Sequence, residues 1–172
     1  MLKKVFSFIT NIFILIEVIL ITIFTLPNLF SIKPYVVTSG SMEPKYPVGS
    51  LIYVKDIKIE ELKKGDVITF YLTNSKIVAT HKIYEINSSE KSFITYGINN
   101  KDEEGNIIKD VNPVRYDDVI GKPILCIPYL GYINKYITST PGIYIVIGIT
   151  MLLVGTSFLI DNIKKEEVGK NE

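Results

Sequence analysis

The stretch from Ser39 to Pro44 reads Ser-Gly-Ser-Met-Glu-Pro, and it lies between a long apolar N-terminal segment and a series of strand-like segments. Gly40 can adopt backbone dihedrals that other residues resist, and Pro44 disfavours a helical conformation at Glu43. These features predict a tight bend that presents the Ser41 hydroxyl, a candidate nucleophile. Composition alone favours an ordinary turn, because Ser, Gly and Pro are the usual turn residues.

Two apolar segments on either side of this bend are predicted to span a membrane. The first runs from Val5 to Leu26 and is long enough to cross a hydrocarbon core of roughly 30 Å. The second runs from Ile143 to Ile160. Lysines precede the first segment and follow the second, so the positive-inside rule predicts that both termini are cytoplasmic and that the middle lies outside. These lysines are Lys3, Lys4, Lys164, Lys165 and Lys170.

The first apolar segment has a second interpretation, as a cleaved signal peptide. Its apolar run is longer than the roughly 7–15 residues of a signal-peptide core, and the residues from Leu26 to Phe30 offer no small-x-small cleavage site. We therefore expect an uncleaved anchor. Glu17, near the middle of this segment, is costly to ionise in lipid, so we expect it to be neutral or to face a partner helix.

Length and composition limit the remaining possibilities. The 172 residues allow one domain of about a hundred residues plus membrane segments, which we place at 1–30, 31–140 and 141–172. A net charge of +1 without a basic block argues against a nucleic-acid partner. Cys126 is the only cysteine, so no intrachain disulfide can form. The sequence has no zinc-site spacing, and we expect no metal and no cofactor.

The middle of the chain is predicted to be a β domain. Four runs are rich in β-branched and aromatic residues and are separated by turn residues. The runs are Leu51–Val54, Val67–Tyr71, Ile77–Ile86 and Phe93–Tyr96. The polar stretch from Asn99 to Pro113 is predicted to be a surface loop. The expected fold class is thus a mainly β extracytoplasmic domain flanked by two transmembrane α-helices.

His81 is the only histidine and the natural candidate for a base that activates a serine. Period-two alternation places it on one strand face with Ile77, Ala79 and Ile83, and places Lys82 on the other face. On such an apolar face, burial and a carboxylate could hold the imidazole in one tautomer. A lone histidine in a strand is nevertheless more often a structural residue than a base.

The bend, together with the preceding Val36-Val37-Thr38, resembles the nucleophile motif of type I signal peptidases. The segment from Thr80 to Ile83, Thr-His-Lys-Ile, resembles the histidine version found in the endoplasmic-reticulum type, which archaea and some Gram-positive bacteria share. The common bacterial type has a lysine base instead. The similarity runs from about Val36 to Tyr132. It implies a signal-peptidase-like β fold and a serine endopeptidase in which Ser41 is the nucleophile and His81 the base.

A carboxylate should orient the imidazole, and here the sequence departs from the family pattern. Ile98 stands where the family usually has the first Asp of a Gly-Asp-x-Asn box. Downstream, the segment Asp110-Val111-Asn112-Pro113-Val114 resembles the second part of the pattern after an apparent insertion. We therefore choose Asp110, with Asp102 and Glu104 as alternatives. The alternative interpretation for each of the three is a solvated acidic residue in a surface loop.

An oxyanion requires donors fixed where negative charge develops. The Ser41 N–H is the natural first donor, and a chain extended through Gly40 would let the Ser39 hydroxyl supply the second. The resemblance points to the same serine and implies preprotein signal peptides as substrates, with the lipid bilayer and the secretion translocon as candidate partners. Two alternatives remain open. One is a dedicated peptidase that acts on a specialised substrate with a Ser-Lys dyad, and the other is a non-enzymatic, membrane-anchored binding domain.

Overall fold

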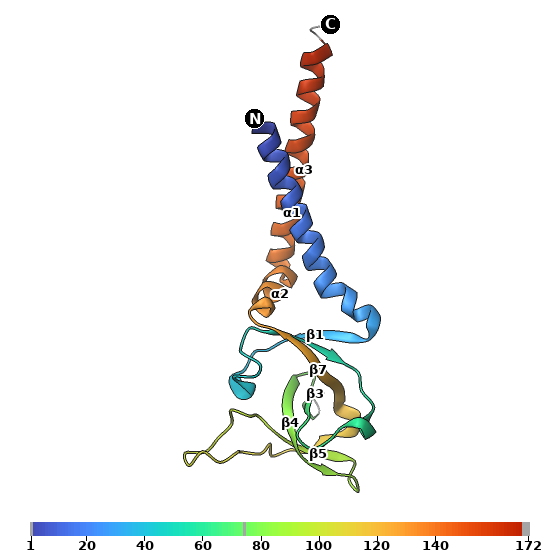
Figure 1. The fold of residues 1–172 in the computed structure, drawn as a ribbon, viewed down its shortest axis with the longest axis vertical. Coiled ribbons are helices and arrows are strands. Elements are labelled where there is room, and N and C mark those ends of the chain that lie inside the picture. The colour runs from blue at the N-terminus through green and yellow to red at the C-terminus, as the bar shows by residue number, and fades with distance from the viewer. Residues whose placement is uncertain (1, 74, 170–172) are drawn as a thin grey trace. The chain divides into compact units, whose positions relative to one another are not determined.

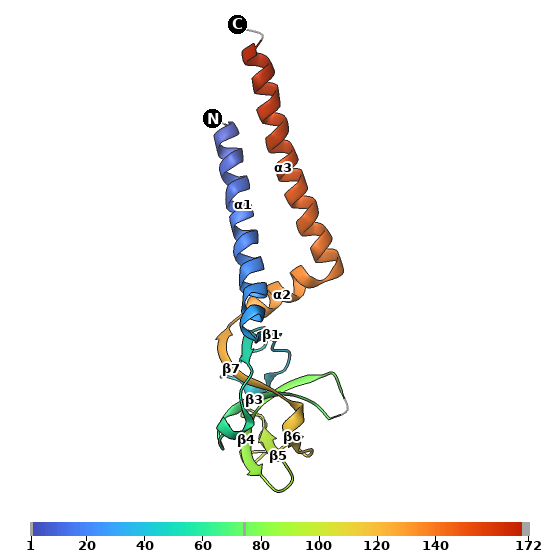
Figure 2. The ribbon, with the colours of Figure 1, turned by 90° about the vertical axis from the view of Figure 1, so that its right-hand side faces the viewer.

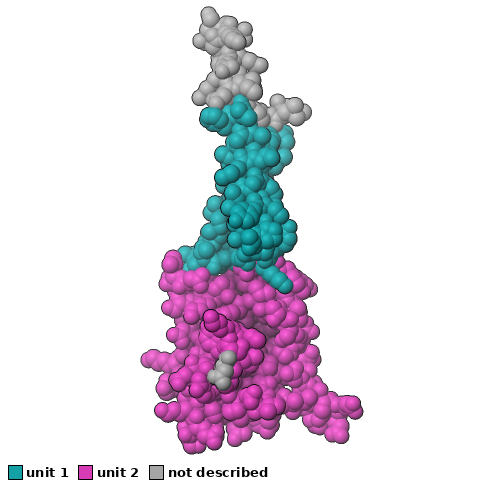
Figure 3. Space-filling view, turned by 180° about the vertical axis from the view of Figure 1, so that it is seen from behind, with its two compact units in different colours: residues 1–26, 135–172 teal, residues 27–134 magenta. Residues whose placement is uncertain are grey.

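The computed structural model describes residues 2–73 and 75–169, and the chain divides into two compact units (Figure 3). One unit combines residues 1–26 with residues 135–172, and the other comprises residues 27–134. The first contains the long apolar helices, and the second contains a β-sheet.

The helical unit contains α1 (Leu2–Thr25) and α3 (Thr140–Gly169), which Figure 2 shows as long, continuous helices. By length and composition, Lys4–Phe30 and Thr140–Leu159 can each cross a membrane, with mean hydropathies of 2.4 and 2.1. The two apolar segments predicted from the sequence thus form helices of sufficient length. The first of these windows extends into a short 3₁₀ helix, η1 (Leu26–Phe30), that follows α1.

Glu17 of α1 faces α3 within this unit. The Thr150 hydroxyl donates a hydrogen bond to Glu17 Oε1 at 2.6 Å. The pair lines a mostly apolar cavity of about 640 Å³, to which residues of α1, of α3 and of the helix that precedes α3 contribute. A carboxyl group among apolar side chains requires such a polar partner, because leaving it unpaired would cost several kcal/mol (roughly 2–7). Of the two alternatives left open for Glu17, neutral or facing a partner helix, the hydrogen bond to Thr150 supports the one in which it faces a partner helix.

The second unit is built on one antiparallel sheet, which lies in the lower part of Figure 1. Its strand order is β1-β2-β7-β3-β4-β5-β6. Its strands are β1 (Ile32–Val36), β2 (Leu51–Lys55), β3 (Val67–Tyr71), β4 (Val78–Asn87), β5 (Ser92–Tyr96), β6 (Val114–Arg115) and β7 (Val119–Ile127). Three short 3₁₀ helices lie in the connections, namely η2 (Gly40–Met42), η3 (Ile59–Glu61) and η4 (Tyr116–Asp118). Helix α2 (Leu130–Thr138) follows β7.

Strand β7 joins the two halves of the sheet, and each half has its own core cluster. The beginning of β7 pairs with β3, and the remainder pairs with β2. One cluster contains Leu62, Ile68, Phe70, Ile83, Phe93 and Val114. The other contains Met42, Tyr46, Ile52, Val54 and Val67. Because Met42 belongs to the second cluster, the bend at Ser41 is anchored directly in a core.

The four strands expected from β-branched and aromatic runs are present as β2, β3, β4 and β5. The sequence did not single out β1, β6 or β7. Pro34 interrupts the pattern of β1, yet β1 is an edge strand, where a missing N–H is tolerated. In β7, Gly121 and Pro123 interrupt the run, and its pairings with both neighbours shift in register. Glycine is required at position 121, because a Cβ there would lie 2.1 Å from the Lys55 carbonyl oxygen.

Candidate active site

The predicted bend at Ser41 is a single turn of 3₁₀ helix, η2. The Glu43 N–H donates to the Gly40 carbonyl at 3.1 Å, and Glu43 itself is extended ahead of Pro44, with φ −67° and ψ 147°. The chain is therefore not extended through Gly40, so the condition under which both serines would project to the same side is not met. The reason is local, since the Glu43 N–H closes the turn. Ser39 and Ser41 nevertheless approach each other, with 3.3 Å between their hydroxyl oxygens.

His81 projects from β4, opposite Ile68 of β3. Its ring meets Phe70 edge-on, with centroids 6.2 Å apart, and its side chain is only 14% exposed. Ala79 and Ile83 pack in the same core cluster as Phe70, which confirms the predicted apolar face. Ile77 is an exception, because it precedes β4 and is 64% exposed.

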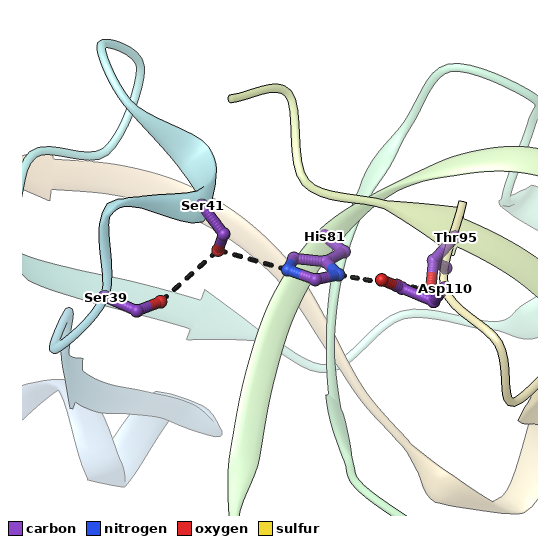
Figure 4. A network of polar contacts seen from close by, with 5 residues as sticks. All are labelled: Ser39, Ser41, His81, Thr95 and Asp110. Atoms are coloured by element: carbon purple, nitrogen blue, oxygen red, sulfur yellow. Dashed lines mark hydrogen bonds and ion pairs between the residues drawn. The ribbon is translucent and has the colours of Figure 1, made fainter. Parts of the chain in front are cut away.

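The imidazole lies between the serine and a carboxylate (Figure 4). His81 Nε2 is 3.1 Å from Ser41 Oγ, and His81 Nδ1 is 2.6 Å from Asp110 Oδ2. The three residues come from η2, from β4 and from the connection between β5 and β6. With Nδ1 protonated and bonded to the carboxylate, Nε2 is free to accept the serine proton.

Asp110 is held in place by Thr95 of β5. The buried Thr95 hydroxyl donates to Asp110 Oδ2 at 2.6 Å, and the Asp110 N–H donates to the Thr95 carbonyl at 2.8 Å. Burial raises the pKa of the Asp110 carboxyl, but the hydrogen bonds from His81 and Thr95 and the charge of His81 outweigh burial and hold this pKa below its usual value. Asp110 is thus kept ionised beside the imidazole.

The two alternative carboxylates make different contacts. Asp102 accepts hydrogen bonds from the Asn106 backbone and side chain and from the Glu104 N–H. Those bonds, with the Asn106 backbone first, lower the pKa of the exposed Asp102 carboxyl. The Glu104 side chain accepts from the same asparagine at 3.3 Å. Both acids therefore shape a surface turn, and among the three candidates the contact to His81 belongs to Asp110.

Three residues that lie against Ser41 or Asp110 were not singled out from the sequence. Thr95 is the first. The sequence signal that could have identified it is its polar side chain within a strand that is predicted to belong to the core. Gly97 is the second, since a Cβ at this position would lie 2.7 Å from the Ser41 carbonyl oxygen and 2.9 Å from Ser41 Cβ. Asn99 is the third, and its backbone N–H donates to the Ser41 carbonyl at 2.9 Å. Ile98, where the resemblance described above leads to the expectation of an acidic residue, packs against the second core cluster.

A groove of about 270 Å³ opens beside Ser41 and His81. The segment after β1 and the start of β4 line it, together with residues of the second core cluster. Most of its side chains are apolar, including Val37, Met42, Ile52 and Ala79. A cavity of this size and character suits small apolar side chains of a bound peptide. Within residues 2–73 and 75–169, no group of three or more His, Cys, Asp or Glu side chains is placed to hold a metal ion.

Residues 9–119 match the family described as "Signal peptidase, peptidase S26". The human "Signal peptidase complex catalytic subunit SEC11C" is 27% identical over 110 residues, which cover 62% of this chain and 57% of that protein. "Signal peptidase I W" of Bacillus subtilis (strain 168) is 40% identical over 89 residues, which cover 50% of this chain and 46% of that protein. The matched segments therefore span roughly half the length of these relatives.

Proposed function

Because this chain belongs to the signal peptidase family, peptidase S26, we propose that it is a membrane-anchored serine endopeptidase that cleaves signal peptides from exported preproteins. The observation that carries the proposal is the contact chain from Ser41 through His81 to Asp110, with distances of 3.1 and 2.6 Å. A serine hydroxyl is a weak nucleophile at neutral pH, and a neutral imidazole within hydrogen-bond reach activates it.

In the proposed mechanism, Ser41 Oγ attacks the scissile carbonyl while His81 Nε2 accepts the hydroxyl proton. The Asp110 carboxylate holds Nδ1 and stabilises the imidazolium that forms. His81 then donates the proton to the leaving amine as the scissile C–N bond breaks. A water molecule next attacks the acyl carbonyl while His81 Nε2 accepts its proton, and His81 returns that proton to Ser41 Oγ as the ester bond breaks. The Ser41 N–H and the Ser39 hydroxyl are the proposed donors to the oxyanion.

The substrate is proposed to bind as an extended strand along the groove. Val36 and Val37 on one side and Val78 and Ala79 on the other line the groove. The Val37 N–H and carbonyl are already bonded to Ser50 and Gly49, so the pairing is proposed for the backbone of Val36, in the edge strand β1. The groove then accommodates alternate side chains of the peptide. The limited volume beside Ser41 favours small side chains before the scissile bond.

We propose that both termini are cytoplasmic and that the β domain acts on the outer face of the cell membrane. The two apolar helices and the flanking lysines support this topology. A membrane anchor would confine the enzyme and a membrane-inserted signal peptide to the same plane. The human relative is by name a catalytic subunit of a complex. By analogy, partner subunits and the secretion translocon are candidate partners of this chain.

A preprotein-processing assay in proteoliposomes tests the proposal. The wild-type chain should release a mature protein of the expected mass, and Ser41→Ala and His81→Ala should each abolish cleavage. A matched control is Ser89→Ala, because Ser89 is an exposed serine whose hydroxyl donates to the Asn87 side chain. Full cleavage by either Ser41→Ala or His81→Ala would refute the Ser-His mechanism.

The Ser-Lys alternative has less support from the contacts of the serine. In the described part of the chain, the Ser41 hydroxyl contacts the Ser39 hydroxyl and His81, and no lysine is among its hydrogen-bond partners. The assay also separates the two chemistries. Normal rates in His81→Ala would point to a lysine base elsewhere, whereas activity in His81→Lys would show that the base position tolerates either side chain.

A further inference from the structure

The peptide group between Gly40 and Ser41 carries the N–H that we propose as an oxyanion donor. This peptide is trans, so its carbonyl and its N–H point in opposite directions. Any contact that fixes the Gly40 carbonyl therefore also fixes the direction of the Ser41 N–H. The residues that bind this carbonyl control the donor without touching the substrate.

Two donors hold the Gly40 carbonyl. The Glu43 N–H reaches it from within the turn at 3.1 Å, and the Asn99 side-chain amide reaches it at 3.0 Å from the loop that follows β5. The Asn99 backbone N–H also donates to the Ser41 carbonyl at 2.9 Å. Asn99 therefore binds the carbonyl groups on both sides of the Ser41 N–H, one through its side chain and one through its backbone.

We infer that Asn99 is a positioning residue, whose side-chain amide orients the Gly40–Ser41 peptide so that the Ser41 N–H faces the developing oxyanion. The inference rests on the proposed function and extends it to a residue that the triad does not include. The Asn99 amide would act on the Gly40–Ser41 peptide in two ways. It would fix the direction of the Ser41 N–H, and it would polarise the peptide, because a hydrogen bond accepted by a carbonyl strengthens the N–H donor of the same peptide group.

The contacts of Asn99 separate this role from a general role in stability. Its side chain is exposed, so its loss opens no core cavity. The bonds from His81 to Ser41 and to Asp110 involve other atoms and remain available when the Asn99 side chain is removed. The backbone bond to the Ser41 carbonyl is also available in Asn99→Ala and Asn99→Asp, because both replacements keep the N–H of residue 99. Removal of the amide should thus impair transition-state stabilisation more than substrate binding.

The test compares Asn99→Ala with Asn106→Ala in the full-length enzyme in proteoliposomes. Asn106 is a matched control, because its side-chain amide donates within the same loop, to Asp102 at 3.1 Å, without contacting Gly40. We expect Asn99→Ala to lower kcat roughly 10- to 100-fold, less than complete loss of an oxyanion donor, and to leave KM unchanged within about twofold. Asn106→Ala should match the wild type.

Inhibitor binding provides a second readout that a structural defect would not reproduce. A peptide aldehyde forms a tetrahedral adduct that carries an oxyanion, whereas a non-cleavable peptide of the same sequence occupies only the ground state. Asn99→Ala should lower the affinity of the enzyme for the aldehyde by the same factor by which it lowers kcat. The affinity for the non-cleavable peptide should not change. The near-isosteric Asn99→Asp places a carboxylate oxygen against the Gly40 carbonyl. This variant should lose at least as much activity as Asn99→Ala, and its unfolding temperature should equal that of the wild type.

Three results would overturn the inference. One is a wild-type kcat in Asn99→Ala. Another is an equal loss of affinity for the aldehyde and the non-cleavable peptide. A third is a fall in activity that merely follows a lower unfolding temperature in both Asn99 variants. If the wild-type chain cleaves no preprotein, the proposed function itself fails, and the inference fails with it. Normal wild-type cleavage with no effect of Asn99→Ala refutes the inference alone.

Discussion

The substitution Gly97→Ala tests how tightly the loop after β5 packs against the serine. An added Cβ would lie 2.7 Å from the Ser41 carbonyl oxygen, which belongs to the backbone and cannot rotate away. Ordinary contact begins near 3.4 Å, so the turn or the loop must move by about 0.7 Å. A displacement approaching 1 Å can reduce the rate of an enzyme by up to about 10²-fold. We expect kcat/KM for preprotein cleavage to fall roughly 10- to 100-fold, together with about 1–3 kcal/mol of unfolding free energy.

Two further glycines serve as controls in the same proteoliposome assay, with thermal unfolding measured in parallel. A Cβ at Gly155 of α3 meets nothing within 4 Å, so Gly155→Ala should retain wild-type activity. A Cβ at Gly40 meets only the Glu43 side chain, at 3.4 Å, so Gly40→Ala should lose less activity than Gly97→Ala even though it adjoins Ser41. Wild-type activity in Gly97→Ala, or equal losses in Gly97→Ala and Gly40→Ala, would refute the steric reasoning.

Three further predictions concern the carboxylate, the core and the helix pair. Asp110→Asn should lower kcat by roughly 10³- to 10⁴-fold, because His81 loses its anionic partner. The pKa of Asp110 lies below its usual 3.8, so this group stabilises the fold above pH 3.8 and loses that contribution as the pH falls through the lowered value. Denaturation curves recorded from pH 7 down to pH 3 should therefore show a higher free energy of unfolding for the wild type than for Asp110→Asn. This difference should shrink only at the acidic end of the range. Phe93→Ala, at a side chain that is 1% exposed, should cost about 3–5 kcal/mol in chemical denaturation. Thr150→Val, which removes the donor to Glu17, should weaken the helix pair by roughly 0.6–2 kcal/mol in mixed-micelle unfolding, and an unchanged value would show that the bond contributes nothing.

Much of the fold could be predicted because local pattern and tertiary environment agree. The apolar segments form α1 and α3, and the runs rich in β-branched residues form β2 to β5. Strand β7 escaped prediction because its glycine and proline, which break a local pattern, are accommodated by register shifts against β2 and β3. Pairing with two neighbours is a property of the folded sheet and leaves little trace in a single sequence.

In the candidate site, too, the residues with a local sequence signal could be predicted, and those defined by tertiary contacts could not. The motif around Ser41 and the alternation around His81 were local signals, and their side chains lie 3.1 Å apart. The choice among three acids depended on how an inserted loop folds back on β5, which spacing alone could not decide. Asn99 carries no local signal either, since its importance lies in a contact with a residue 59 positions earlier.

Covalent labelling of Ser41 by a fluorophosphonate, followed by mass spectrometry of the modified peptide, tests whether His81 activates this serine. An activated Ser41 should give one adduct at that position in the folded wild-type chain and none there in Ser41→Ala, and labelling should be slowed by at least about 10²-fold in His81→Ala, the order expected for loss of a general base. An adduct rate unaffected by His81→Ala, or a folded wild-type chain that takes no label at Ser41, would contradict the activation of Ser41 by His81.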